Sequence, residues 1–367
     1  MYVAAKGGEE AILNAEQFYR LLNGDLTPET VKTIEEKLPY LIDRVMGEGA
    51  LYAPELAALA IAQTGGDLYE AVLLLRAYRA TQPRIAYAEP VHPDEVLTLR
   101  RISAAFKDVP GGQVLGPTLD YSHRLLNLDV LDGHAQPAPA LEAAQTPAPP
   151  HYPAVEEWQR AQGLLPTVQP DTTPPAALPD VTTDNVMFPA PRAHRLQALA
   201  RADTGGVLAL GYSIMRGYGL IHPTVNELRV GYADVALRHP ITGETFSAGR
   251  VRVSQCEVVS PDPGETGYST GFAATLGWNE VKLIAASTLD MDMNTGSGHP
   301  AHNEEFVLYH TEPVEASGFC IHFKLPHYVT FASGLDNVRK VAQAVYGASN
   351  GAAVVNSPAP APAQEES

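Results

Sequence analysis

Cysteines and long apolar runs are both scarce in this chain of 367 residues. The two cysteines, Cys256 and Cys320, form no C-x-x-C pair, so we expect them to be reduced and to hold no iron–sulfur cluster. No apolar stretch approaches the roughly eighteen residues that a membrane-spanning helix needs, and the first residues lack the apolar core of a signal peptide. The sequence therefore predicts a cytoplasmic protein with no membrane contact.

Positive charge is also in short supply. The chain has 25 Lys and Arg against 42 Asp and Glu, a net charge of −17, which argues against nucleic acid as a partner. The balance reverses between residues 76 and 107, where six basic side chains accompany three acidic ones. Such a stretch can bind a phosphorylated small molecule, although surface ion pairs are the commoner explanation.

The familiar nucleotide-binding and hydrolase motifs are missing. There is no G-x-x-x-x-G-K-[ST] loop, no G-x-G-x-x-G after a clear strand, no G-x-S-x-G elbow and no H-E-x-x-H. These absences exclude the best-known phosphate loops and nucleophile elbows. The residues by themselves predict an α+β protein with candidate metal and phosphate sites.

Composition divides the chain into four regions. Residues 1–133 are mainly helical in pattern, with a Thr27-Pro28 helix start and an Asp67–Glu70 capping pair inside a helical stretch over 27–82. Residues 134–191 are rich in Pro and Ala, with thirteen prolines from 137 to 191, and are predicted to be an extended linker without a core. Residues 192–345 form an α+β region, and 346–367 a disordered tail.

The third region predicts a hairpin, a helix and two further strands. The β-rich runs 227–237 and 250–259 flank the turn-like HPITGET, which indicates an antiparallel hairpin. Residues 278–291 have a helical pattern with a cap near Asn279. The short apolar runs 304–310 and 318–325 are expected to be strands.

The densest polar segment is RRISAAFKDVPGGQVLGPTLDYSHRLL, residues 100–126. Its arginines match phosphate oxygens, and its Pro-Gly-Gly turn permits close backbone approach to a ligand. A tight turn with internal ion pairs is the commoner explanation for such a segment.

Two histidines frame a proline in HFKLPHYV, residues 322–329. On an ideal helix or strand, imidazoles five residues apart point away from each other, so only a bend at Pro326 can bring His322 and His327 together. The H-x₄-H spacing suits zinc, while core or surface histidines remain the commoner outcome. A second group, His299, His302 and His310, lacks a consistent face and is a weaker metal candidate.

Several long segments together resemble one family: MYVAAKGGEEAI, DRVMGEGALY, LAALAIAQTGGD, LLLRAYRATQPR, RRISAAFKDVPGGQVLGPTLDY and HFKLPHYV. The chain is similar over about residues 1–130 and 192–335 to the I subunit of the bacterial carbon–phosphorus lyase core complex. That subunit is part of α-D-ribose 1-methylphosphonate 5-triphosphate synthase. The linker and the tail lie outside the similarity.

The resemblance implies a reaction and a set of partners. A phosphonate oxygen displaces adenine from ATP, or guanine from GTP, and water takes its place when the subunit acts alone as a nucleosidase. The implied partners are the G, H and J subunits, with the ATP-binding-cassette-like subunits K and L, and self-association within the complex. The radical iron–sulfur chemistry belongs to the J subunit, in keeping with the cysteines here.

The resemblance and the chemistry of the residues together suggest site residues. The family's metal-binding histidines correspond to His322 and His327, which favours zinc or another divalent cation there. In segment 100–126, the phosphate donors are expected to be Arg100, Arg101, Lys107 and the Gly111-Gly112 backbone, and the catalytic carboxylate Asp108 or Asp120. The alternative is a scaffold subunit whose metal loop completes a partner's active site.

Overall fold

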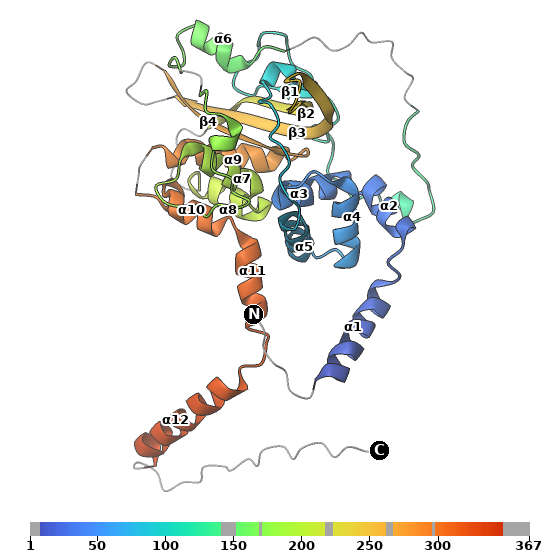
Figure 1. Ribbon diagram of the computed structural model, residues 1–367, viewed down its shortest axis with the longest axis vertical. Helices are drawn as coiled ribbons and strands as arrows, with labels where there is room; N and C mark the ends of the chain where they lie inside the picture. The colour runs from blue at the N-terminus through green and yellow to red at the C-terminus, as the bar shows by residue number, and fades with distance from the viewer. Residues whose placement is uncertain are drawn as a thin grey trace. The chain divides into compact units, whose positions relative to one another are not determined.

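The computed structural model describes residues 8–140, 152–168, 171–216, 223–261, 267–295 and 298–347 (Figure 1). The chain divides into two units, Phe18–Ser317 and Met1–Gln17 together with Gly318–Ser367. The helices are α1 Glu9–Asn23, α2 Pro28–Lys37, α3 Pro39–Gly49, α4 Pro54–Gln63, α5 Leu68–Ala80, α6 Val155–Ala161, α7 Arg192–Arg201, α8 Thr204–Ser213, α9 Glu280–Met293, α10 Glu304–His310, α11 Pro313–His322 and α12 Tyr328–Tyr346. The strands are β1 Leu97–Ile102, β2 Thr224–Arg238, β3 Thr245–Pro261 and β4 Tyr268–Leu276, so the α+β prediction is confirmed.

Helices α2 to α5 occupy the stretch that the sequence predicts to be helical. The Thr27 hydroxyl accepts from Thr30 N at 3.2 Å and starts α2, and the Asp67 carboxylate accepts from Tyr69 N and Glu70 N to start α5. These side chains satisfy backbone donors that a helix start leaves open. The helices bury one apolar cluster built on Ile42, Val45, Met46, Ala57, Ala58, Ala60, Ile61, Ala71, Val72 and Leu75.

The four strands form one antiparallel sheet in chain order. The predicted hairpin is confirmed as β2 and β3, whose tip is closed by a hydrogen bond from His239 N to Glu244 O at 2.8 Å. Residues of neighbouring strands align across the sheet: Leu228 pairs with Cys256, which pairs with Ala273. Because side chains alternate along a strand, this register assigns each residue to one of two faces.

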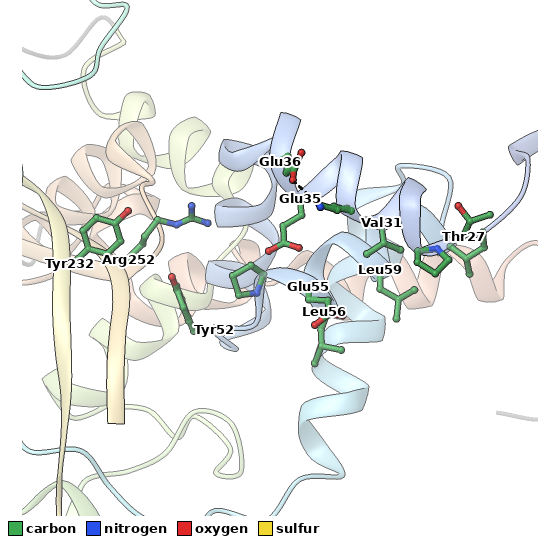
Figure 2. Close-up of a pocket in the computed structure, with 14 residues that line it drawn as sticks. Thr27, Val31, Glu35, Glu36, Tyr52, Glu55, Leu56, Leu59, Tyr232 and Arg252 are labelled. Carbon is green, nitrogen blue, oxygen red and sulfur yellow. Dashed lines mark ion pairs between the residues drawn. The ribbon is translucent and has the colours of Figure 1, made fainter. Parts of the chain in front are cut away.

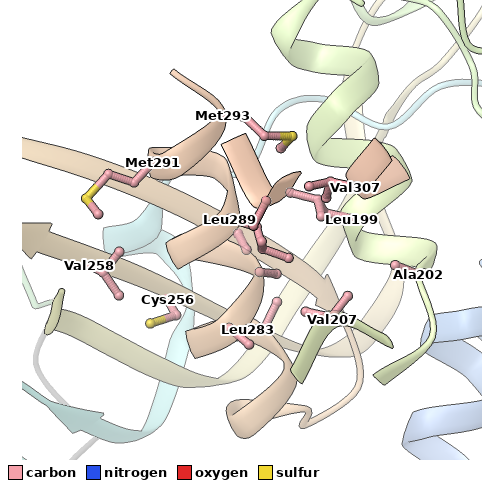
Figure 3. Close-up of a cluster of buried hydrophobic side chains, with 14 of the residues drawn as sticks. Leu199, Ala202, Val207, Cys256, Val258, Leu283, Leu289, Met291, Met293 and Val307 are labelled. Atoms are coloured by element: carbon pink, nitrogen blue, oxygen red, sulfur yellow. The ribbon is translucent and has the colours of Figure 1, made fainter. Parts of the chain in front are cut away.

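The face that carries Leu228, Cys256 and Ala273 is apolar and packs against α9 (Figure 3). Helices α7, α8 and α10 add to the same core, on the side of the sheet opposite α6 in Figure 1. The approach is close, because a Cβ at Gly271 would lie 1.9 Å from Ser287 O of α9. Only glycine fits that position.

The opposite face of the sheet carries a row of polar residues. Arg101 of β1 aligns with Arg229 of β2, which aligns with Gln255 of β3. Glu227 and Glu257 form the adjoining pair. A buried face with this many charged groups must satisfy them internally, and it does so with the segments that cross it.

Two predicted strands are helices instead. Residues 304–310 form α10, where the Asn303 side chain accepts from Phe306 N at 2.8 Å, and residues 318–322 of the other predicted strand belong to α11. Short apolar runs do not distinguish strand from helix by periodicity. The helix-start signals decide here: the Asn303 cap for α10, and Glu315 in the first turn of α11.

The described part of the Pro/Ala-rich region, residues 134–191, contains packed structure that linker composition did not predict. Val155 on α6 is fully buried, and the Gln159 amide exchanges two hydrogen bonds of 2.8 Å with the Asn226 amide. Prolines kept most of this region out of regular elements without preventing its packing. Most of the predicted tail, from 348 onward, lies outside the described residues.

Among the described helices, none is both long and apolar enough to cross a membrane alone. Helices α3 and α4 reach the necessary length and apolar content only when the two are counted together, and they meet at a bend of 97°. Both helices contribute to the apolar cluster of α2 to α5, as expected for core helices.

Candidate functional site

Arg101, a predicted phosphate ligand, is engaged on the polar face of the sheet. Its Nε lies 2.5 Å from Glu227 Oε1, and its terminal nitrogens donate to the carbonyls of Pro110, Gly112 and Pro153 at 2.6–2.9 Å. The side chain is 1% exposed. In this chain the guanidinium therefore ties the loop after β1 to the sheet, and a phosphate would have to displace several of these bonds.

Arg100 is equally occupied. Its Nε contacts Glu280 Oε2 at 2.9 Å, one terminal nitrogen donates to Leu115 O at 2.5 Å, and the other pairs with Asp120. The arginine is buried, whereas Asp120 is about half exposed. Arg100 thus joins strand β1, the start of α9 and the loop that carries Asp120.

The remaining predicted residues lie on the loop between Arg101 and Asp120. Lys107 and Asp108 are exposed, and the Asp108 carboxylate bonds to no other described residue. Gly111 and Gly112 have φ values of 82° and 77°, the left-handed region that favours glycine. Their turn presents the Gly112 carbonyl to Arg101, so it shapes the loop around that arginine.

Sequence analysis missed a buried carboxylate group beside Arg101. Glu257 accepts from the Asn226 amide and shares a hydrogen bond with Glu156, while Glu227 bridges Arg101 and Arg229. Burial, followed by the charge of Glu156, raises the pKa of Glu257 to about 8. Acidic residues inside the β-rich runs ELRVGY and CEVV were the available signal.

His322 and His327 meet across the break between α11 and α12. Their Nε2 atoms are 3.2 Å apart, and the ring centres are 4.8 Å apart. The predicted bend around Pro326 is therefore present. Two imidazole nitrogens on a tetrahedral zinc, each at about 2.0–2.1 Å, would be separated by about 3.3 Å, so the spacing fits one shared ion.

The hydrogen bonds of the two rings suit metal binding at one of them. His327 Nδ1 lies 2.6 Å from Leu325 O, which places its proton on Nδ1 and leaves Nε2 free to accept or to ligate. His322 Nδ1 is buried without a partner in the described structure. His322 Nε2 then holds the proton shared between the rings, and a metal would move that proton to Nδ1.

The histidine pair is incomplete as a metal site. In the described parts of the chain, no group of three or more His, Cys, Asp or Glu side chains is arranged to hold an ion. Of the weaker candidates, the rings of His299 and His302 are 5.9 Å apart, and His310 stacks on Phe306 instead. A structural zinc site takes four protein ligands, so the pair fits an open or shared site.

A cavity of about 950 Å³ opens between α2, α4 and the β2–β3 hairpin (Figure 2). Glu35, Glu36 and Glu55 line it with two tyrosines, Tyr52 and Tyr232. Its cations are engaged: Arg252 pairs with Asp43 at 2.7 Å, and Lys32 lies 3.8 Å from Glu36. The lining is too acidic for a polyphosphate.

Comparison with known proteins identifies the family. The model of the bacterial phosphonate metabolism protein (PhnI) family matches residues 1–345. The chain belongs to this family. The match spans the Pro/Ala-rich region as well, which the sequence had placed outside the similarity.

Named relatives agree with the PhnI family match. The chain is 41% identical over 358 residues to the α-D-ribose 1-methylphosphonate 5-triphosphate synthase subunit PhnI of Rhizobium meliloti, covering 93% of this chain and 95% of that protein. It is 40% identical over 356 residues to the protein of the same name from Escherichia coli, covering 94% and 99%. A putative C-P lyase subunit protein, HtxH of Stutzerimonas stutzeri, is 45% identical over 357 residues, covering 92% and 95%.

Proposed function

We propose that this chain is the synthase subunit of a carbon–phosphorus lyase complex and transfers ribose 5-triphosphate from ATP, or from GTP, to a phosphonate. The observation that carries the proposal is the 40–41% identity, over nearly the full length, to two relatives named as that synthase subunit. The role in phosphonate metabolism follows from the family. The chain is proposed to act in the cytoplasm, in a complex with the G, H, J, K and L subunits. A second copy of the chain belongs to the same complex.

The proposed reaction exchanges one bond at the anomeric carbon. A phosphonate oxygen forms a bond to C1′ of the ribose as the bond from C1′ to the purine nitrogen breaks, and the bonding pair leaves with the base. The base takes up a proton and departs as neutral adenine. Water as the acceptor gives ribose 5-triphosphate and adenine, which is the nucleosidase reaction.

The carboxylates of the loop after β1 have different surroundings, and this difference guides their roles. Asp108 is exposed and unpaired among the described residues, so it is available to stabilise an oxocarbenium-like transition state. Asp120 is held by Arg100. We assign Arg100 and Arg101 positioning roles, since each holds this loop through several bonds.

His322 and His327 are proposed to hold a divalent cation, most simply zinc, through their Nε2 atoms. When bound, such an ion polarises phosphate or phosphonate oxygens as a Lewis acid. The spacing of 3.2 Å and the Nδ1 bond of His327 support the pair as ligands. The remaining ligand positions fall to water, substrate or a partner subunit.

The deciding experiment incubates the purified chain with ATP and measures adenine by chromatography. Release of adenine with ribose 5-triphosphate, abolished or slowed at least 10²-fold in Asp108→Asn, is the expected result. With methylphosphonate and the partner subunits present, the sugar product should be α-D-ribose 1-methylphosphonate 5-triphosphate in place of ribose 5-triphosphate. No base release by the chain alone or in the complex would overturn the proposal.

The second candidate function is a scaffold whose histidine pair completes a partner's active site. The incomplete ligand set favours this candidate, since two protein ligands do not close a zinc site. It predicts tight metal binding only in the assembled complex and no base release by the isolated chain. Base release by the chain without metal would exclude it as the sole function.

A further inference from the structure

A second cavity, of about 790 Å³, lies on the face of the sheet opposite α9. Its walls come from the three strands β2, β3 and β4, the segment 84–96, the turn at 180–182 and the C-terminal end of α7. Most of the lining is apolar, including Val235, Val253, Phe272, Ala274 and Leu276. The cavity is large enough for a drug-sized or nucleotide-sized ligand.

Charge is concentrated at one edge of this cavity, in a group that we call the arginine cluster. The cluster consists of Arg76, Arg79, Arg84 and Arg201. Arg84 and Arg201 line the cavity directly, whereas Arg76 and Arg79 do not line it. Arg76 reaches Arg201 O at 3.1 Å, and the charge of Arg79 acts on Arg201. The three arginines between residues 76 and 84 belong to the basic stretch of the sequence, and the fold adds Arg201.

Two carboxylates only partly neutralise the arginine cluster. Glu312 bridges Arg76 at 2.6 Å and Arg201 at 3.3 Å, and Asp180 pairs with Arg84. Four cations against two anions leave a local charge of +2 in a chain whose total is −17. Concentrated positive charge at a cavity edge attracts anions.

The arginine cluster also has unused hydrogen-bond donors. The side chain of Arg79 bonds to no described residue, and its Nη1 and the Nε of Arg201 are buried without partners. Burial and the neighbouring Arg76 lower the pKa of both guanidiniums. An anion at this edge would satisfy the free donors and relieve the repulsion between the arginines.

We propose that this cavity is the nucleoside triphosphate site, with the phosphates on the arginine cluster and the purine against the apolar strand residues around Phe272 and Ala274. The lining is charged at one end and apolar at the other, so it suits a ligand with a polyanionic group at one end and a flat apolar ring at the other. This inference rests on the proposed use of ATP and names where in the chain ATP binds. It replaces the expectation that Arg100, Arg101, Lys107 and the Gly111-Gly112 backbone hold the phosphates, since none of these residues lines the cavity.

The test measures binding of ATP, inorganic tripolyphosphate and adenosine to the full chain by isothermal titration calorimetry. Arg79→Ala should weaken ATP and tripolyphosphate by roughly tenfold or more, since it removes charge-assisted hydrogen bonds to phosphate. Ala274→Trp, at an exposed lining position, should fill the base side of the cavity and weaken ATP and adenosine while sparing tripolyphosphate. Arg339→Ala, an exposed arginine of α12, is the control and should bind like the wild type.

The outcomes separate this site from the proposed function. Wild-type ATP affinity in both Arg79→Ala and Ala274→Trp would overturn the site, even if the chain still released adenine. Failure of the wild-type chain to bind ATP or tripolyphosphate would overturn it as well. Hydrogen-exchange protection of segment 84–96 by a partner subunit, but not by ATP, would show instead that this face is a protein interface. Loss of base release with ATP binding intact would count against the proposed reaction alone.

Discussion

The loop after β1 and the junction of α11 and α12 carry the two sets of predicted ligands, and they differ in how far the chain satisfies them. Arg100 and Arg101 are buried, and each makes at least three bonds to other groups of the chain. The rings of His322 and His327 contact each other through their Nε2 atoms, and His322 Nδ1 has no partner among the described residues. Residues of the right chemical type thus serve the fold in one region and remain available in the other.

The contrast separates side chains that hold the fold together from side chains that are open to a ligand. A guanidinium whose N–H donors all bond to backbone carbonyls and carboxylates holds a loop in place. A buried nitrogen without a partner marks a place where a ligand, a metal or another subunit can bind. By that criterion, Arg79 and His322 are stronger ligand candidates than Arg100 or Arg101.

The largest effect is expected from Arg101→Ala. It removes one of the two arginine partners of Glu227, which keeps Arg229, and three bonds to the loop and to Pro153. The free energy of unfolding should therefore fall by roughly 3–5 kcal/mol. Urea unfolding measures the change. Arg124→Ala, which removes an exposed pair with Asp120 at 3.8 Å, is the control and should change stability by less than about 1 kcal/mol. A stable Arg101→Ala chain with a raised KM for ATP would restore the ligand role.

Removing either histidine of the pair should abolish metal binding and leave the fold intact. His322→Ala and His327→Ala each take one of two protein ligands, so zinc content, measured by elemental analysis of the assembled complex, should fall to background. His310→Ala is the matched control, because that histidine stacks on Phe306 and is not one of the pair. Full zinc content in His322→Ala or His327→Ala would show that the ion is held elsewhere. Thermal melting checks that the variants are folded.

A smaller effect, dependent on pH, is expected from the buried carboxylates. The pKa of Glu257 is raised from 4.5 to about 8, so the folded chain holds a proton there that the unfolded chain releases. This contribution to stability is full below pH 4.5 and is lost as the pH rises to about 8. Burial raises the pKa of Asp292 from 3.8 to about 7. Its contribution to stability is therefore also lost with rising pH, between about pH 3.8 and pH 7.

Glu257→Gln tests this pH dependence. The amide can still accept from Asn226 and can always donate to Glu156, so at pH 8 the variant should be more stable than the wild type by roughly 2 kcal/mol. At pH 5 the two should be nearly equal. Melting temperatures across pH 5–8 measure the difference. Parallel curves for the two proteins would mean that Glu257 is ionised throughout this range.

The smallest effect is expected from shortening the Pro/Ala-rich region. Deletion of residues 138–148 should change stability by less than about 1 kcal/mol, because this stretch has linker composition and closure entropy depends only weakly on the length of a connection. Deletion of 152–162 should be far more damaging, since it removes α6 with Val155 and the Pro153 carbonyl that Arg101 uses. Soluble yield and melting temperature of the two deletions compare them. Equal behaviour would show that α6 contributes little to the fold.

The sequence by itself determined the features that depend on neighbouring residues. Thr27 and Asp67 cap α2 and α5, the turn of HPITGET closes the β2–β3 hairpin, and Pro326 forces the bend that joins the two histidines. Each rests on a few adjacent side chains and backbone groups, so a local pattern is sufficient. The resemblance in several long segments determined the family for the same reason.

The tertiary structure alone decided which polar groups are free. Arg101 donates its Nε hydrogen to Glu227, 126 positions away in the sequence. Arg76 donates to the carbonyl of Arg201, 125 positions away. It also decided that residues 304–310 are a helix over the sheet and that part of the Pro-rich region packs against β2. A side chain's chemistry is written in the sequence, but its availability depends on acceptors and burial that distant segments supply only when the chain has folded.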